Sequence, residues 1–121
     1  MKKALVIVLF GLIIFLSCSK DNGGNGGGGG GSTVNCATVT NKAFNADVLP
    51  IITSSCAINT TCHATGSTNG PGALTNWAQV SGNAGAIKTA VQSGRMPQTG
   101  SLTTGQKNSI TCWVDNGALN N

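Results

Sequence analysis

Two thiols, one imidazole and one thioether are the groups of this sequence best suited to binding a metal or a cofactor. The segment CAINTTCH (residues 56–63) joins Cys56 and Cys62 to His63, which is the chain's single histidine. Met96 follows later, directly before a proline. Thiolates and thioethers are soft ligands that suit Cu(I), and imidazole suits several transition metals. These four side chains could therefore form a metal site, or the two thiols alone could form a disulfide that closes a small loop.

Neither catalysis nor nucleic-acid binding is indicated by the remaining charged residues. The only acids are Asp21, Asp47 and Asp115, so no carboxylate pair is available for acid–base chemistry. No serine or cysteine nucleophile is accompanied by a supporting His and Asp arrangement. The formal net charge of +4 includes Lys2 and Lys3 and comes from scattered residues, with no basic run or aromatic platform for nucleic acid. We therefore expect a binding module and not an enzyme.

Apolar periodicity predicts an all-α domain of three to five short helices. The first helix is expected to begin between Asn45 and Asp47, because Pro50 is tolerated only near the first turn of a helix. Further helices are predicted over 74–80, over 83–92, and from Thr103 or Thr104 to residue 116. The segments 60–72 and 95–100 are predicted to be loops, and no alternating strand pattern is present.

The first 35 residues are expected to export and tether this domain. Residues 1–17 combine Lys2 and Lys3 with an apolar run that has the length of a secretory leader. The run ends in FLSC, which resembles a bacterial lipobox, so the resemblance implies that Cys18 is lipidated. The alternative is a plain signal peptide or a short membrane anchor with an incidental cysteine. Residues 18–35, rich in Gly, Asn and Ser, are predicted to be a flexible linker.

Residues 36–121 then form one small domain, which at this size needs a covalent staple or a cofactor for stability. Four cysteines remain after Cys18 to provide it: Cys36, Cys56, Cys62 and Cys112. In an exported protein these cysteines are expected to form disulfides or to bind a cofactor.

The CAINTTCH segment resembles the haem-attachment signature of c-type cytochromes, in which a histidine directly follows the second of two cysteines. The usual signature has two residues between the cysteines, whereas five separate Cys56 from Cys62. Three extra residues are close to one helical turn, so a bulged turn could return Cys62 and His63 to their places. The resemblance implies one haem c, attached through Cys56 and Cys62, with His63 as an axial ligand.

The order of motifs resembles that of small class I cytochromes c. In that family a methionine before the last helix is the second axial ligand, which implies this role for Met96; the alternative is an ordinary core methionine. The family also places a Trp of the terminal helix near the haem edge, which implies this place for Trp113, the alternative again being a core residue. Because the terminal helices of the family touch, a disulfide between Cys36 and Cys112 is implied, the alternative being two free thiols.

The function implied by this resemblance is electron transfer in the cell envelope. The protein would be lipid-anchored to a bacterial membrane, facing the periplasm or the cell surface, and would meet a redox partner protein transiently. With His63 and Met96 both bound to iron, no position would remain for a substrate. Two alternatives stay open: an envelope binding lipoprotein without haem, stapled by disulfides, and a copper site built from Cys56, Cys62, His63 and Met96.

Overall fold

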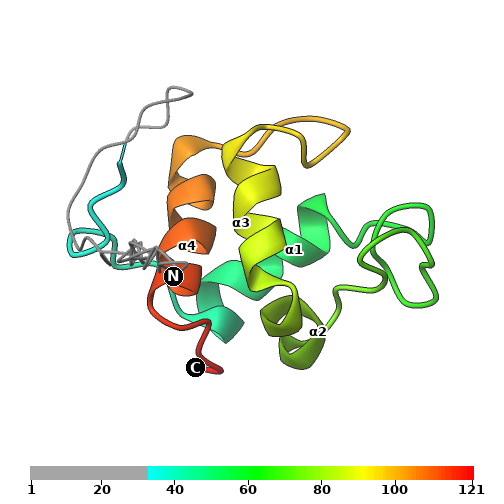
Figure 1. Cartoon of the computed structure of the whole chain (residues 1–121), viewed down its shortest axis with the longest axis horizontal. Coiled ribbons are helices and arrows are strands. Elements are labelled where there is room, and N and C mark those ends of the chain that lie inside the picture. The colour runs from blue at the N-terminus through cyan, green and yellow to red at the C-terminus, as the bar shows by residue number, and fades with distance from the viewer. Residues whose placement is uncertain (1–32) are drawn as a thin grey trace, which may run out of the picture.

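A computed structural model describes residues 33–121 and shows an all-α arrangement (Figure 1). The elements are a π-helical turn η1 (Phe44–Val48) and the helices α1 (Leu49–Ser55), α2 (Trp77–Gly82), α3 (Ala84–Gln92) and α4 (Thr104–Asp115). No strand occurs between residues 33 and 121, and no helix there is long and apolar enough to cross a membrane. The expected leader, Cys18 and most of the expected linker lie outside the described residues.

The first helix begins earlier than expected, because a π-helical turn precedes the α-helix. In η1 the N–H of Val48 donates to the carbonyl of Ala43 at 3.1 Å. Pro50 has no N–H to donate, so it fits only in the first turn of α1, where the structure places it. Asp47 belongs to the π-helical turn η1. Its carboxylate lies within the first turn and accepts the N–H of Ala43 at 2.9 Å.

Two of the later helices, α2 and α4, are preceded by residues whose side chains cap them. The side chain of Asn76 accepts the N–H of Gln79 at 3.1 Å, so α2 begins at Trp77 and not at Leu74 as predicted. At α4, Thr103 and Gln106 form a reciprocal capping box. The predicted last two helices, 83–92 and 103–116, agree with α3 and α4 to within one residue at each end.

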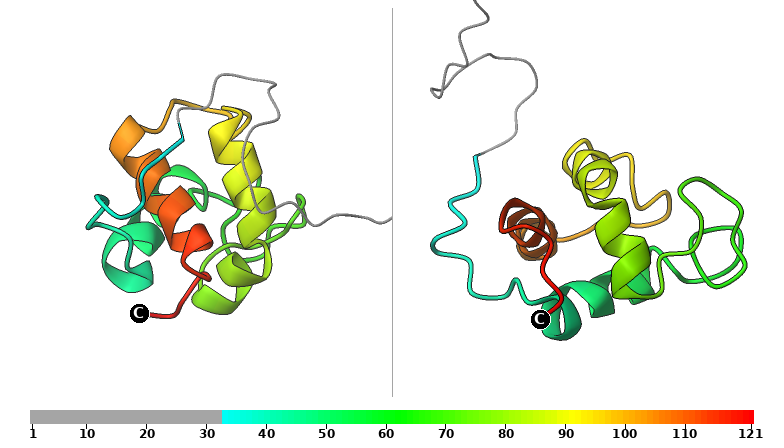
Figure 2. Two further views of the ribbon diagram at one scale, coloured as in Figure 1. Left: turned by 60° about the vertical axis from the view of Figure 1, so that its left-hand side comes forward. Right: turned by 60° about the horizontal axis from the view of Figure 1, so that its bottom comes forward.

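The core lies where η1, α1, α3 and α4 meet (Figure 2). Helices α3 and α4 pack against each other, and α4 also packs against η1. The rings of Phe44 and Trp113, both almost fully buried, are 5.3 Å apart between centroids. The remaining fully buried large side chains come from these elements and from α2: Val48, Ile52, Val80, Val91, Ile110 and Cys112.

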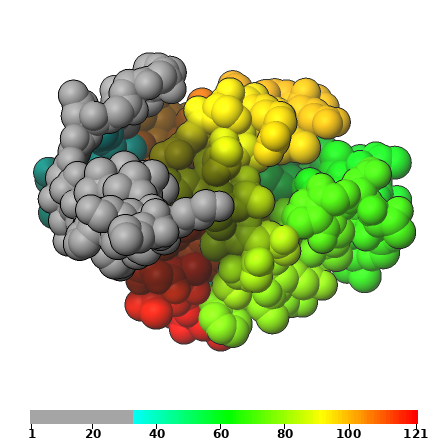
Figure 3. Space-filling view, in the orientation of Figure 1, coloured from blue at the N-terminus to red at the C-terminus, as the bar shows by residue number. Residues whose placement is uncertain are grey.

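Two links fix α4 in this core. Cys36 and Cys112 form a disulfide across 76 residues of sequence, with their Cα atoms 5.3 Å apart. Lys88 of α3 forms an ion pair with Asp115 of α4. At the other side of the molecule lies the loop of residues 56–76, coloured green in the space-filling view (Figure 3), from which Cys56 and Leu74 contribute to the core. The described domain therefore has a stapled helical side and a side built largely from loops.

Candidate cofactor site

All four side chains singled out by their chemistry line one cavity. This cavity measures about 570 Å³ and includes Cys56, Cys62, His63 and Met96 in its wall. It lies between the end of α1, the loop that follows α1, and the loop that follows α3. Its remaining lining residues are uncharged: Ser55, Ile58, Asn59, Thr61, Asn69, Gly70, Pro97, Gln98 and Thr99. Two segments separated by more than thirty residues of sequence thus present their sulfur and imidazole groups to the same space.

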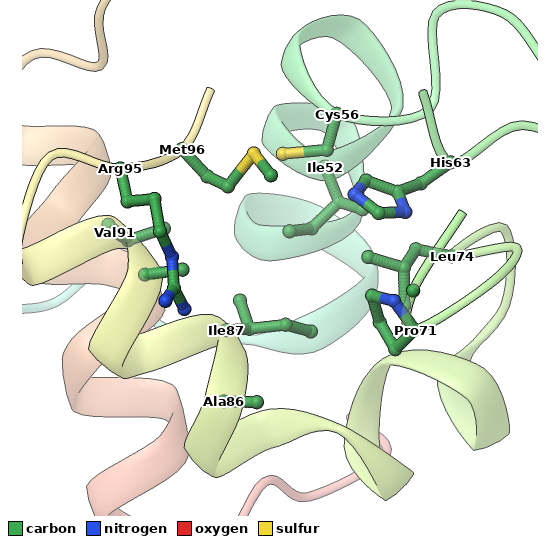
Figure 4. A pocket seen from close by; sticks show the side chains of 12 residues that line it. Ile52, Cys56, His63, Pro71, Leu74, Ala86, Ile87, Val91, Arg95 and Met96 are labelled. Atoms are coloured by element: carbon green, nitrogen blue, oxygen red, sulfur yellow. The ribbon is translucent and has the colours of Figure 1, made fainter. Parts of the chain in front are cut away.

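A second cavity of about 300 Å³ adjoins the first and reaches between α1 and α3 (Figure 4). Cys56, His63 and Met96 line both cavities. The inner cavity is otherwise mostly apolar, with a wall made by Ile52, Pro71, Leu74, Ala86, Ile87, Ala90 and Val91. Pockets with an apolar wall and a few convergent polar groups are typical of small-molecule and cofactor sites.

The long spacer between the two cysteines forms a closed loop. The N–H of His63 donates to the carbonyl of Cys56 at 3.0 Å, which brings the two ends of the spacer together. Asn59 holds the loop, because its side-chain oxygen accepts the N–H of Cys62 at 3.0 Å and the hydroxyl of Thr61 at 2.7 Å. The five-residue spacer therefore leaves Cys56 and His63 next to each other.

The imidazole of His63 is buried and held in one orientation by the backbone. Its side chain lies with Nδ1 at 2.9 Å from the carbonyl oxygen of Gly72, and the residue is 7 % exposed. The N–H of Leu74 donates to the carbonyl of His63 at 2.8 Å, which fixes the backbone as well. When Nδ1 donates to a carbonyl, Nε2 is unprotonated and can act as a metal ligand.

Cys56 and Cys62 are free thiols in this structure, so the expected alternative of a disulfide between them is not the arrangement found. Cys56 is buried at the end of α1, whereas Cys62 is partly exposed. Burial raises the pKa of the Cys56 thiol, and the neighbouring Cys62 raises that pKa further. Burial therefore disfavours the thiolate form of Cys56.

Met96 reaches the cavity from the loop that follows α3. Its N–H donates to the carbonyl of Ala90 at 3.1 Å, which ties the loop to the last turn of the helix. The side chain is half-buried, and Figure 4 shows its sulfur pointing toward the sulfur of Cys56 across the cavity. The His63 ring lies on the opposite side of this view from the Met96 backbone.

Trp113 is not brought to this site. It lines neither cavity, because it lies on the face of α4 that packs on η1, against Phe44. Its indole N–H donates to the carbonyl of Leu119 at 2.8 Å, within the C-terminal segment. Of the two places considered for Trp113, the structure shows the core, and Trp113 lies at the edge of neither cavity.

Two features of the cavity wall are not predicted by the sequence. Arg95 lines the inner cavity, and the carbonyl of Gly72 positions His63. The one sequence feature that could indicate the place of Arg95 is that it directly precedes Met96. Nothing in the turn residues 70–72 indicates that the Gly72 carbonyl contacts His63.

The described residues contain no group of three or more His, Cys, Asp or Glu side chains arranged to hold a metal ion. The donors that do face the cavity are of three kinds: thiol sulfur, imidazole nitrogen and thioether sulfur. Comparison of the chain with protein-family models, with curated proteins and with solved structures found no match in any of the three.

Proposed function

We propose that this protein is an electron-transfer protein of the cell envelope that holds one haem covalently through Cys56 and Cys62, with His63 and Met96 as axial ligands. The observation that carries the proposal is the common cavity: all four side chains line it, although they come from segments far apart in the sequence. No other histidine is present in the chain to compete with His63 for the iron.

The chemistry of the donor set fits this cofactor. A haem iron takes four ligands from its porphyrin and therefore requires only two from the protein, which agrees with one imidazole and one thioether. The porphyrin face is apolar, as is most of the inner cavity. The hydrogen bond between His63 and the carbonyl of Gly72 is the kind of outer contact that usually accompanies a ligating histidine.

The unusual spacing of the cysteines is compatible with attachment. The bond from the His63 N–H to the Cys56 carbonyl closes the spacer, so that Cys56 and His63 lie next to each other despite the extra residues. Cys62 stays at the wall of the outer cavity, held by Asn59. Lengthening a loop costs only about 0.6 kcal/mol per doubling of its length, so stability does not prevent the insertion.

The residues of the site have separate tasks in this proposal. Cys56 and Cys62 would anchor the cofactor, and His63 would be held in position by Gly72. A methionine ligand raises the reduction potential, so Met96 would set the working range of the protein. When bound, the haem supplies a one-electron couple. With both axial positions taken by protein side chains, we propose an electron carrier and not a catalyst.

The proposed location follows from the sequence pattern at the N-terminus. A lipid on Cys18 would anchor the chain to a bacterial membrane, and residues 19–35 would let the domain reach its partners. The partner would be a redox protein that binds transiently, as is usual for electron-transfer encounters.

The proposal is tested by producing the full-length chain in a host that matures c-type haem. We expect a red protein whose colour stays with the polypeptide after acid-acetone extraction. Met96→Ala should keep the haem but lower the reduction potential, because a sulfur ligand is lost. Iron, and not copper, should be found by metal analysis. A potential that does not change in the variant would remove Met96 from the ligands, and a colourless wild-type protein would contradict the function itself.

A further inference from the structure

Arg95 is the only residue in the wall of the inner cavity that carries a permanent charge. Figure 4 shows its side chain folded back along Val91, so that the guanidinium lies beside the cavity. An arginine side chain stays protonated in proteins and presents a planar set of N–H donors. A charge placed at a mostly apolar cavity is unfavourable for a wholly apolar occupant and favourable for an occupant with an acidic group.

The guanidinium of Arg95 has no acidic partner within residues 33–121. The single ion pair found there joins Lys88 to Asp115, and the other described acid, Asp47, accepts a hydrogen bond from the backbone of Ala43. No carboxylate in the described part of the chain therefore pairs with the Arg95 guanidinium. Arg95 is exposed to solvent and at the same time lines the inner cavity, so its charged group is available to an occupant of that cavity.

We infer that Arg95 binds a carboxylate of the ligand in this cavity, through a forked pair of hydrogen bonds. The inference rests on the proposed function, in which the ligand is a haem and the carboxylate is one of its two propionates. Arginine is the side chain best matched to a carboxylate, because its two parallel N–H groups meet both oxygens. Arg95 would then be a positioning residue. It would fix the orientation of the ligand in the cavity next to Met96, and it would partly neutralise the negative charge of the ligand.

The test compares the haem-loaded full chain with three variants. In Arg95→Gln a positive charge is removed and the propionate stays unneutralised, so the oxidised state is favoured. We expect a change of about tenfold in the redox equilibrium, which is about 59 mV toward lower potential for a one-electron couple. Arg95→Lys keeps the charge but cannot form the fork, and its potential should lie between those of Arg95→Gln and the wild type. Lys107→Gln, which removes a charge from a residue lining neither cavity, is the control and should change the potential far less.

The thermal midpoint of the haem-loaded protein gives a second reading. Arg95 is exposed and unpaired in the described chain, so its replacement should lower the midpoint only through a lost contact with the ligand. A loaded Arg95→Gln protein with wild-type potential and wild-type midpoint would overturn the inference while leaving the proposed function intact. An Arg95→Lys protein with the wild-type potential would overturn the forked pairing. If the wild-type chain acquires no haem, the proposed function fails, and the inference fails with it.

Discussion

The two sides of this domain are stabilised in different ways. On the stapled side, η1 and α4 bury Phe44 and Trp113 against each other, and the Cys36–Cys112 disulfide holds the N-terminal segment to α4. On the cavity side, the loops after α1 and α3 are held mainly by hydrogen bonds, such as those of Asn59, and enclose open space. We expect the stapled side to supply most of the stability, because the disulfide and the two largest buried rings lie there.

The largest expected effect comes from removing the staple. The double variant Cys36→Ala, Cys112→Ala opens a link across 76 residues and should lower the free energy of unfolding by about 4 kcal/mol. Urea unfolding of the haem-free chain measures this. The matched control is Cys62→Ala, which removes a partly exposed free thiol and should change the stability by about 0.5 kcal/mol or less. Equal losses in the two proteins would show that the stapled side is not the stable one.

A smaller effect is expected from Asn59→Ala on the cavity side. This change removes the side-chain oxygen that holds Cys62 and Thr61, at a cost of about 1 kcal/mol. Asn76→Ala is the matched control, since it removes the cap of α2 at a similar cost of about 1 kcal/mol. We expect the fraction of chains that acquire haem to fall in Asn59→Ala and to stay at the wild-type level in Asn76→Ala. Similar loading of both would mean that Asn59 contributes to stability alone.

The smallest effect concerns the two free thiols of the haem-free chain. Because burial raises the pKa of Cys56, its thiolate fraction at neutral pH is low, and alkylation should proceed more slowly there than at Cys62. The rate at Cys56 should keep rising with pH until the pH passes its raised pKa. Peptide mapping after timed alkylation at several pH values measures both rates. Faster alkylation of Cys56 than of Cys62 would contradict the burial seen in the structure.

The sequence predicted the parts of the fold that local rules control. The cap at Thr103 and the glycine stop at Gly94, which has a positive φ, define the ends of α4 and α3 within one residue. The π-turn at the start of the domain could not be predicted in this way. The N–H groups of Phe44 and Asn45 donate to Asn121, at the other end of the chain, and no local pattern contains such a contact.

The candidate site was predictable in its donors but not in its surroundings. The sequence pattern singles out Cys56, Cys62 and His63, which the structure brings to the wall of one cavity, and the length of the spacer predicts a bulged turn between the cysteines. The hydrogen bond between the His63 ring and the Gly72 carbonyl could not be predicted, because every residue has a backbone carbonyl and the residue types do not indicate which one the ring meets. Trp113 was placed by resemblance beside the cofactor, although its own sequence pattern says only that it is buried, and the structure places it in the core.

The most direct test of the central claim is the mass of the proteolytic peptide that contains residues 56–63, taken from protein produced with c-type haem maturation. The account predicts this peptide with the mass of one haem added, and with neither Cys56 nor Cys62 open to alkylation. An unmodified peptide with two thiols that can be alkylated, or one in which the two cysteines form a disulfide, would contradict it.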